Sequence, residues 1–106
     1  VTGANSGIGF CLSKYLASRG ATLYMACRSP ERAEAAKTEI VSASGSSKVF
    51  IVIADCGVKQ DVARCIEEVS AHESALDGLV CNAGALLHER TETKYGDEET
   101  FATHLL

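Results

Sequence analysis

The chain has 106 residues, 46% of them hydrophobic and 23% charged, a composition that fits one globular domain and excludes two independent ones. Ten Lys and Arg stand against fourteen Asp and Glu, giving a net charge of −4, and the basic residues are scattered, so we expect no nucleic-acid partner. The cysteines are odd in number and form no Cys-x-x-Cys pair, which argues against a disulfide framework or a zinc site. They are expected to be buried, reduced thiols: Cys11, Cys27, Cys56, Cys65 and Cys81.

No apolar run is long enough to span a membrane, and no basic-then-apolar leader precedes Val1. We therefore expect a reducing intracellular compartment, the cytoplasm by default, although a signal or membrane anchor upstream of Val1 would change this. Val1-Thr2-Gly3 is typical of the end of a strand, so the natural chain is expected to begin earlier.

Helical spacing of apolar residues follows Gly7 and predicts an amphipathic helix over about 7–19, ended by Gly20. Its apolar stripe is Ile8, Cys11, Leu12, Tyr15 and Leu16. The β-rich run 22–27 predicts a buried strand. Ser29 as N-cap and Pro30 at the first helical position predict a second helix, ending near residue 43.

The nearly continuous apolar run 48–53 predicts the strongest strand of the chain. Helical spacing returns between residues 58 and 73, with Asp61, Glu67 and Glu68 on the solvent side. A turn at Asp77-Gly78 then leads into a short buried strand over 79–81. A loop over 85–96 and the start of a helix over 98–106 complete the chain. This alternation of strands and helices predicts a parallel sheet with helices on both faces.

The motif Thr2-Gly3-Ala4-Asn5-Ser6-Gly7-Ile8-Gly9 stands where the first strand meets the first helix. Its glycines allow a tight turn, a close approach to a pyrophosphate and close packing of the helix on the strand. The free N–H groups and the positive dipole end of the helix would attract the phosphates. Glycine-rich turns also join strands to helices in proteins that bind no nucleotide, so the motif alone leaves a structural role open.

In this context Thr-Gly-x-x-x-Gly-Ile-Gly resembles the cofactor fingerprint of the short-chain dehydrogenase/reductase family, and three further motifs follow in the family's order. Cys27-Arg28-Ser29 ends the second strand, where the family reads the adenosine ribose. Asp55 follows the third strand, at the family's place beside the adenine ring. Cys81-Asn82-Ala83-Gly84 is a variant of the family's Asn-Asn-Ala-Gly. The sequence of residues 27–33, Cys-Arg-Ser-Pro-Glu-Arg-Ala, is most similar to that of the retinol-dehydrogenase-like branch of the family.

The resemblance implies a Rossmann-type α/β fold with a doubly wound parallel sheet and strand order 3-2-1-4. It covers residues 1–106 as one partial NAD(P)-binding domain, clipped at both ends. The cofactor-binding residues that it implies are Gly3, Asn5, Ser6, Gly7, Ile8, Gly9, Arg28, Asp55, Asn82, Ala83 and Gly84. No metal ligand is implied.

Charge at the end of the second strand favours NADP over NAD. An acidic residue there would bind both ribose hydroxyls of NAD, whereas Arg28 offers donors to a 2′-phosphate. The structural alternative for Arg28 is an ion pair with Glu31 or Glu34. Asp55 has an alternative as an N-cap or turn residue, and Asn82 is expected to bond to backbone and hold the strand ends together.

The family's catalytic pattern is a Tyr followed four residues later by a Lys, aided by a Ser, and this chain has no such pair. Tyr15, Tyr24 and Tyr95 are followed at that spacing by Arg19, Arg28 and Glu99, so no catalytic residue is assigned. His104 stands where the branch carries an Asn, whose role does not transfer to it.

The implied function is an NADP-dependent oxidoreductase that acts on a small-molecule alcohol or carbonyl by hydride transfer. This chain would be its dinucleotide-binding half, inactive alone, and the full-length protein would be a homo-oligomer. The alternative is a non-catalytic nucleotide-binding module or truncated isoform that docks to a partner. Contact with a membrane stays open.

Overall fold

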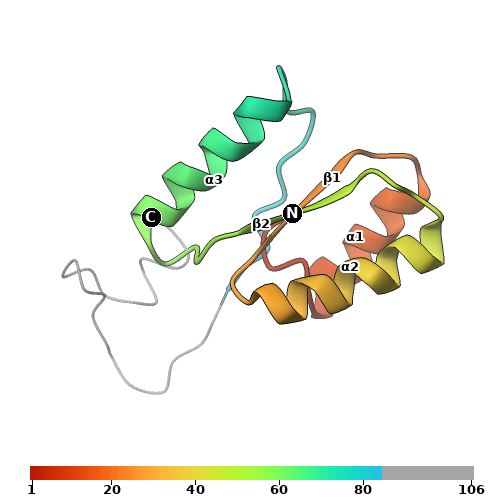
Figure 1. The fold of residues 1–106 in the computed structure, drawn as a ribbon. Helices are drawn as coiled ribbons and strands as arrows, with labels where there is room; N and C mark the ends of the chain where they lie inside the picture. Colours follow the sequence, from red (N-terminus) through yellow and green to blue (C-terminus); the bar gives the residue numbers. More distant parts are fainter. Residues whose placement is uncertain (85–106) are drawn as a thin grey trace.

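The computed structural model describes residues 1–84, so the predicted loop over 85–96 and the predicted helix from residue 98, with His104, lie outside them. The elements follow one another as α1 (Gly7–Ser18), β1 (Leu23–Cys27), α2 (Pro30–Ser44), β2 (Val49–Ile53) and α3 (Lys59–His72). Each begins and ends within a residue of its predicted bounds. In Figure 1, α1 and α2 lie side by side on one face of the strands and α3 lies on the other. Within residues 1–84, every helix is too short or too polar to span a lipid bilayer.

The strands run parallel and bring four chain segments side by side. β1 pairs with β2 from Leu23↔Val49 to Cys27↔Ile53. On the other side of β1, Thr2 forms a parallel bridge with Ala26, and Thr2 N–H donates to the carbonyl of Val80 at 3.0 Å. The segments therefore follow the predicted order 3-2-1-4, with β2 outermost.

The predicted strand over 79–81 was wrong as a regular strand. Residues 79–84 have no regular secondary structure, although Val80 is bonded to Thr2. Leu79 is 66% exposed, so its side chain is largely uncovered by the described residues. A strand with a partner on one side and an uncovered face gains too little from burial to become regular.

Local sequence signals explain the bounds of α2. Ser29 has extended backbone and its hydroxyl accepts a hydrogen bond from Arg32 N–H at 3.4 Å, while Pro30 occupies the first helical turn. At the other end Gly45 adopts φ 70°, the left-handed conformation that commonly terminates helices. The helix packs Ala33, Ala36 and Ile40 against the sheet and α1.

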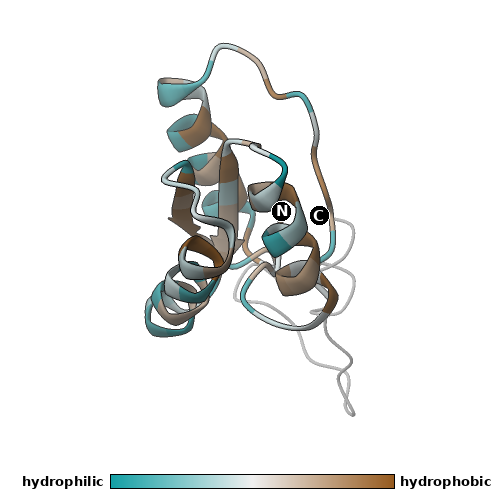
Figure 2. Cartoon of the chain, turned by 90° about the vertical axis from the view of Figure 1, so that its right-hand side faces the viewer, coloured by the Kyte–Doolittle hydropathy of each residue, from teal (hydrophilic) through white to brown (hydrophobic). Residues whose placement is uncertain are grey.

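The buried face of α1 differs from the predicted apolar stripe. Gly9, Ser13 and Ala17, four residues apart, are the buried positions, whereas Ile8 is 80% and Tyr15 59% exposed. At Gly9 the close approach of α1 to the carbonyl of Gly3 leaves no room for a side chain. Apolar spacing therefore identified the helix but not the side that packs. In Figure 2 the strands between the helices are predominantly hydrophobic.

Ser13 is fully buried, and its hydroxyl has no hydrogen-bond partner. A buried hydroxyl without a partner loses its hydration and gains nothing in return, at a cost of about 1 to 3 kcal/mol. We expect Ser13→Ala to raise the free energy of unfolding by about 1 kcal/mol in urea denaturation. Ser18→Ala is the matched control, since the Ser18 hydroxyl is exposed and bonded to the Tyr15 carbonyl. Equal or lower stability of Ser13→Ala would contradict the expectation.

The prediction that the cysteines are buried holds only for Cys27. All five cysteines are free, but Cys11 and Cys81 are exposed and Cys56 and Cys65 are partly exposed. Cys11 lies on the exposed part of the predicted apolar stripe of α1, with Ile8 and Tyr15, whereas Leu16 of the same stripe packs against the core. Cys81 lies on the segment after Leu79.

Candidate functional site

The predicted site residues gather at the carboxyl edge of the sheet. Gly3 N–H donates to the carbonyl of Ala26 at 2.9 Å, so the glycine-rich loop, residues 3–9, begins beside the end of β1. Ala54 N–H donates to the carbonyl of Cys27 at 2.9 Å, which aligns the ends of β1 and β2. Arg28 and Asp55 follow directly. Along this edge the order is Asp55, Arg28, the glycine-rich loop and the segment at Asn82, and open α/β sheets bind ligands at such edges.

The glycine-rich loop needs its glycines for different reasons. Gly3 and Gly7 have φ of 64° and 57°, a conformation that side chains disfavour. Gly9 has ordinary backbone, but a Cβ there would stand well inside contact distance of the Gly3 carbonyl oxygen and 2.5 Å from Asn82 Nδ2. A side chain at position 9 is therefore incompatible with the packing of α1 on the loop.

The start of α1 is open to an anion. Ser6 is the N-cap, yet its hydroxyl makes no cap hydrogen bond, and the first turn carries no acidic side chain. The first N–H groups of an α-helix lack partners within the helix, and they carry the positive end of its dipole. Ile8, 80% exposed in the same turn, offers apolar surface for a ligand to cover. The N–H donors, the helix dipole and the lack of side chains at Gly3, Gly7 and Gly9 fit the pyrophosphate of a dinucleotide.

Thr2 and Asn82 hold the loop to the segment after Val80. The Thr2 hydroxyl accepts hydrogen bonds from the N–H groups of Asn82 and Ala83, both at 2.9 Å. Asn82 Nδ2 donates to the carbonyls of Thr2 and Gly3, at 3.2 and 3.4 Å. Asn82 thus makes the backbone contacts expected of it. The role of Thr2 was missed, although its place in the motif was a signal.

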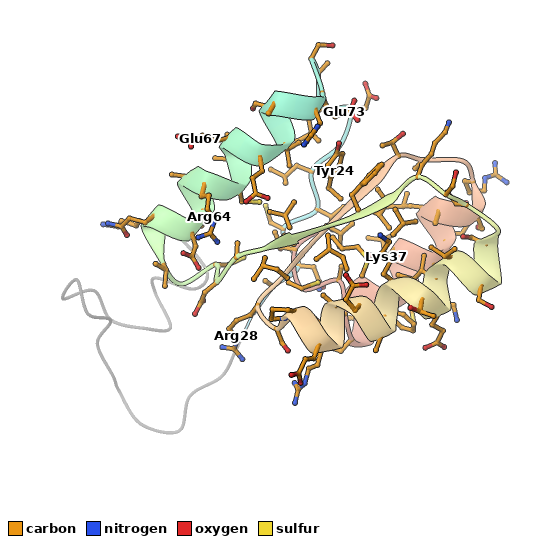
Figure 3. The ribbon with its side chains drawn as sticks, viewed as in Figure 1. Tyr24, Arg28, Lys37, Arg64, Glu67 and Glu73 are labelled. Carbon is orange, nitrogen blue, oxygen red and sulfur yellow. The ribbon has the colours of Figure 1, made fainter. Side chains whose placement is uncertain are left out.

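Arg28 is exposed at the end of β1, and Figure 3 shows its side chain directed outward beyond the start of α2. The alternative of an ion pair with Glu31 or Glu34 is not observed, and within residues 1–84 the guanidinium has no hydrogen-bond or ion-pair partner. Its charge is therefore available to an anionic ligand.

Asp55 forms the turn between β2 and α3, as its structural alternative predicted, but Val58 and not Asp55 is the N-cap of α3. Asp55 Oδ1 accepts from Gly57 N–H at 2.9 Å, and Val58 N–H donates to the Asp55 carbonyl at 3.0 Å. The expectation that Asp61 lies on the solvent side of its helix was wrong. Its Oδ2 accepts from Asp55 N–H at 2.9 Å, a contact that helical periodicity cannot reveal.

Cys27 lies beneath the glycine-rich loop and is 2% exposed. Burial raises the pKa of its thiol, and the backbone N–H groups of Ala4 and Asn5, which stabilise the thiolate, offset part of this rise. The thiol is therefore neutral in the folded protein at a pH where it ionises in the unfolded chain.

Because the pKa of Cys27 is higher in the folded state, its contribution to stability is present below the unfolded value of about 9 and is lost as the pH rises above it. We expect the free energy of unfolding of wild type to fall more steeply between pH 8 and roughly pH 10 than that of Cys27→Ala. Chemical denaturation in the presence of a thiol reductant measures both slopes. Cys11→Ala, at an exposed position, is the control. Identical slopes for wild type and Cys27→Ala would contradict the expectation.

A groove of about 520 Å³ lies along the outer edge of β2, away from the glycine-rich loop. Its floor includes Tyr24 and Phe50, whose rings stack with centroids 5.3 Å apart. The Tyr24 hydroxyl donates to Glu73 at 3.1 Å, and desolvation together with this carboxylate raises the pKa of Tyr24. This tyrosine therefore supports the packing of α3 on the sheet. No cluster of His, Cys, Asp or Glu within residues 1–84 is arranged to hold a metal ion.

Comparison with known proteins matches residues 1–105 to the family model of short chain dehydrogenases. The chain is 40% identical over 106 residues to dehydrogenase/reductase SDR family member 12 of Bos taurus, covering all of this chain and 33% of that protein. It is 38% identical over 98 residues to retinol dehydrogenase 11 of Mus musculus, covering 92% of this chain and 31% of that protein. The chain thus spans about a third of the length of these curated relatives.

Solved structures give the same result. A short-chain dehydrogenase from Sphingobium yanoikuyae in complex with NADPH superposes with a TM-score of 0.78 at 28% identity, over 97% of this chain and 41% of that one. Menthone neomenthol reductase from Mentha piperita superposes with a TM-score of 0.73 at 36% identity, over 80% of this chain and 30% of that one. These matches confirm the predicted truncated Rossmann-type fold and the resemblance read from the motifs.

Proposed function

The chain belongs to the short-chain dehydrogenase family, and on that premise we propose that it is the cofactor-binding part of an NADP-dependent oxidoreductase. The substrate class is a small-molecule alcohol or carbonyl. The bound cofactor would supply a hydride to a carbonyl as NADPH, or accept one from an alcohol as NADP⁺. The observation that carries this proposal is the uncapped start of α1 at the same sheet edge as Arg28, a cation without a partner among residues 1–84.

The residues of this chain would bind and orient the dinucleotide. The N–H groups at the start of α1 would hold the pyrophosphate, and Gly7, where a Cβ would point into open space, leaves room for it to approach. Arg28 would bind the 2′-phosphate of the adenosine ribose with two or more N–H donors, and Asp55 lies on the far side of Arg28, where the adenine would follow. The other end of the dinucleotide would then extend toward Ala83 and Gly84.

The 2′-phosphate is the part of the cofactor on which the choice of NADP depends. Two structures similar to this chain hold NADPH, the short-chain dehydrogenase described above and an L-sorbose reductase from Gluconobacter frateurii. They support a nicotinamide dinucleotide in general. The preference for NADP in this chain is proposed from Arg28 and from the lack of an acidic residue at positions 27 to 29.

Hydride transfer also requires a group that donates or accepts a proton, and no Tyr-x-x-x-Lys occurs in this sequence. We propose that the whole protein supplies that group outside these residues, in a homo-oligomer within a reducing compartment. The comparisons do not favour the alternative of a non-catalytic module, because the relatives are named as dehydrogenases and reductases.

The test is an assay of the whole protein that carries this chain. NADPH absorbance is followed with a panel of aliphatic and aromatic aldehydes and ketones, and NADP⁺ reduction with the corresponding alcohols. We expect consumption of NADPH with at least one carbonyl, at a slower rate with NADH. Tight nucleotide binding without turnover of any panel member would contradict the oxidoreductase proposal.

A further inference from the structure

A carboxylate on α3 is bonded to the backbone of the segment that carries Asp55. Asp61 Oδ2 accepts a hydrogen bond from Asp55 N–H at 2.9 Å. Asp61 is the third residue of α3, a position from which an acidic side chain usually bonds to the N–H of the N-cap. Here the N-cap is Val58, and Asp61 reaches past it to Asp55. The side chain of Asp61 is 28% exposed, so the bond is partly shielded from water.

Arg64 also binds the backbone at the end of β2, at a residue that precedes Asp55. Its Nη2 donates to the carbonyl of Ile53, the last residue of β2, and its Nη1 lies 3.4 Å from Asp61 Oδ1. Glu68 lies 3.7 Å from Arg64 Nε. Figure 3 shows Arg64 on the side of α3 that faces β2 and Glu67 on the side turned away. Asp61 and Arg64 therefore fix the backbone on both sides of residue 54.

This attachment determines where the Asp55 carboxylate lies. Its Oδ1 is occupied by Gly57 N–H at 2.9 Å, and no described residue bonds to Oδ2. The position of the free oxygen, Oδ2, is determined by the backbone at residue 55 and by the hydrogen bond from Gly57 N–H to Oδ1. Without Asp61 the Asp55 N–H loses its acceptor, and the turn can rotate away from the sheet edge.

We propose that Asp61, supported by Arg64, is a positioning residue that holds Asp55 for recognition of the adenine ring. This inference rests on the proposed function. In the bound state the free Asp55 oxygen accepts a hydrogen bond from the exocyclic amine of adenine, while Asp61 itself touches no part of the cofactor.

The test compares NADPH with its hypoxanthine analogue, in which an oxygen replaces the exocyclic amine. Wild type is expected to bind NADPH about tenfold more tightly, since one charge-assisted hydrogen bond separates the two nucleotides. Asp61→Ala is expected to reduce this preference to roughly twofold or less. Asp61→Asn keeps an oxygen that accepts from Asp55 N–H and should retain most of the preference.

The ratio of the two affinities separates positioning from general stability. A variant that is merely less folded binds both nucleotides more weakly by the same factor, so its ratio does not change. Glu67→Ala, which removes an exposed carboxylate from the same helix, is the matched control and should keep the wild-type ratio. An Asp61→Ala protein with the wild-type ratio would overturn the inference.

A second measurement needs no cofactor. Amide hydrogen exchange at Asp55, followed by NMR, should be slow in wild type and Glu67→Ala and at least about tenfold faster in Asp61→Ala. Equal protection in Asp61→Ala would overturn the inference even if the nucleotides bind. If wild type shows the protection but binds neither nucleotide, the proposed function fails, and with it the role of Asp61 toward adenine.

Discussion

Replacing Gly9 with Ala is expected to destabilise the fold by about 3 kcal/mol and to remove nucleotide binding. The added Cβ would overlap the carbonyl oxygen of Gly3 and lie 2.5 Å from Asn82 Nδ2. Both atoms are held, because Asn82 bonds to the carbonyls of Thr2 and Gly3. Relief of the overlap would move the start of α1 away from the loop and separate the donors that would face the pyrophosphate.

Urea denaturation and calorimetric titration with NADPH measure these two effects. Gly78→Ala is the matched control, because a Cβ there meets no atom within 4 Å and its φ is not positive. It should change the free energy of unfolding by less than about 0.5 kcal/mol. Wild-type stability and affinity in Gly9→Ala would show that the loop does not need the close packing that the structure displays.

Replacing Arg28 with Asp is expected to weaken NADPH binding about 10- to 100-fold, and to leave NADH binding unchanged or slightly tighter. The guanidinium has no partner among the described residues, so its loss should cost little stability. Its replacement removes the donors to the 2′-phosphate and adds repulsion against it. A carboxylate at that place can instead accept hydrogen bonds from the ribose hydroxyls of NADH.

Arg19→Asp makes the same change of charge at the C-cap of α1, after its last helical residue, and is the control for general electrostatic effects. It should change the affinities for NADPH and NADH by the same small factor. Equal losses for both nucleotides in Arg28→Asp would show that Arg28 is structural rather than selective.

Local signals in the sequence predicted the elements because each depends on neighbouring residues. Ser29, Pro30 and Gly45 act within one turn of α2, and the continuous apolar run at 49–53 needs no tertiary information to be identified as a strand. The glycine motif was equally informative. Its spacing placed Gly9 where close packing excludes a side chain, and the structure gives the atoms responsible.

Packing between elements was predicted less well. The apolar stripe of α1 placed Ile8 and Tyr15 inside, but the small residues Gly9, Ser13 and Ala17 are the buried ones. Which side of a helix is buried depends on the distance to its neighbour, and periodicity carries no information about that distance. The exposure of Cys11 follows from the same error.

Contacts between side chains of one element and the backbone of another could not be predicted from the sequence either. The bond from Asp55 N–H to Asp61 depends on the angle at which α3 leaves β2, and the Thr2 hydroxyl meets Asn82 and Ala83 only through the sheet order. The site residues themselves were named from motifs. The structure brings them to one sheet edge and adds Thr2, Asp61 and Arg64 as groups that hold that edge in place.

Calorimetric titration of the purified chain with NADPH and, separately, NADH tests most directly whether this sheet edge is an NADP site. Circular dichroism first establishes that the chain is folded. The expected result is a single site that binds NADPH at least about tenfold more tightly than NADH, because Arg28 is matched to the 2′-phosphate. A folded chain that binds neither nucleotide, or that binds NADH more tightly, would contradict the account.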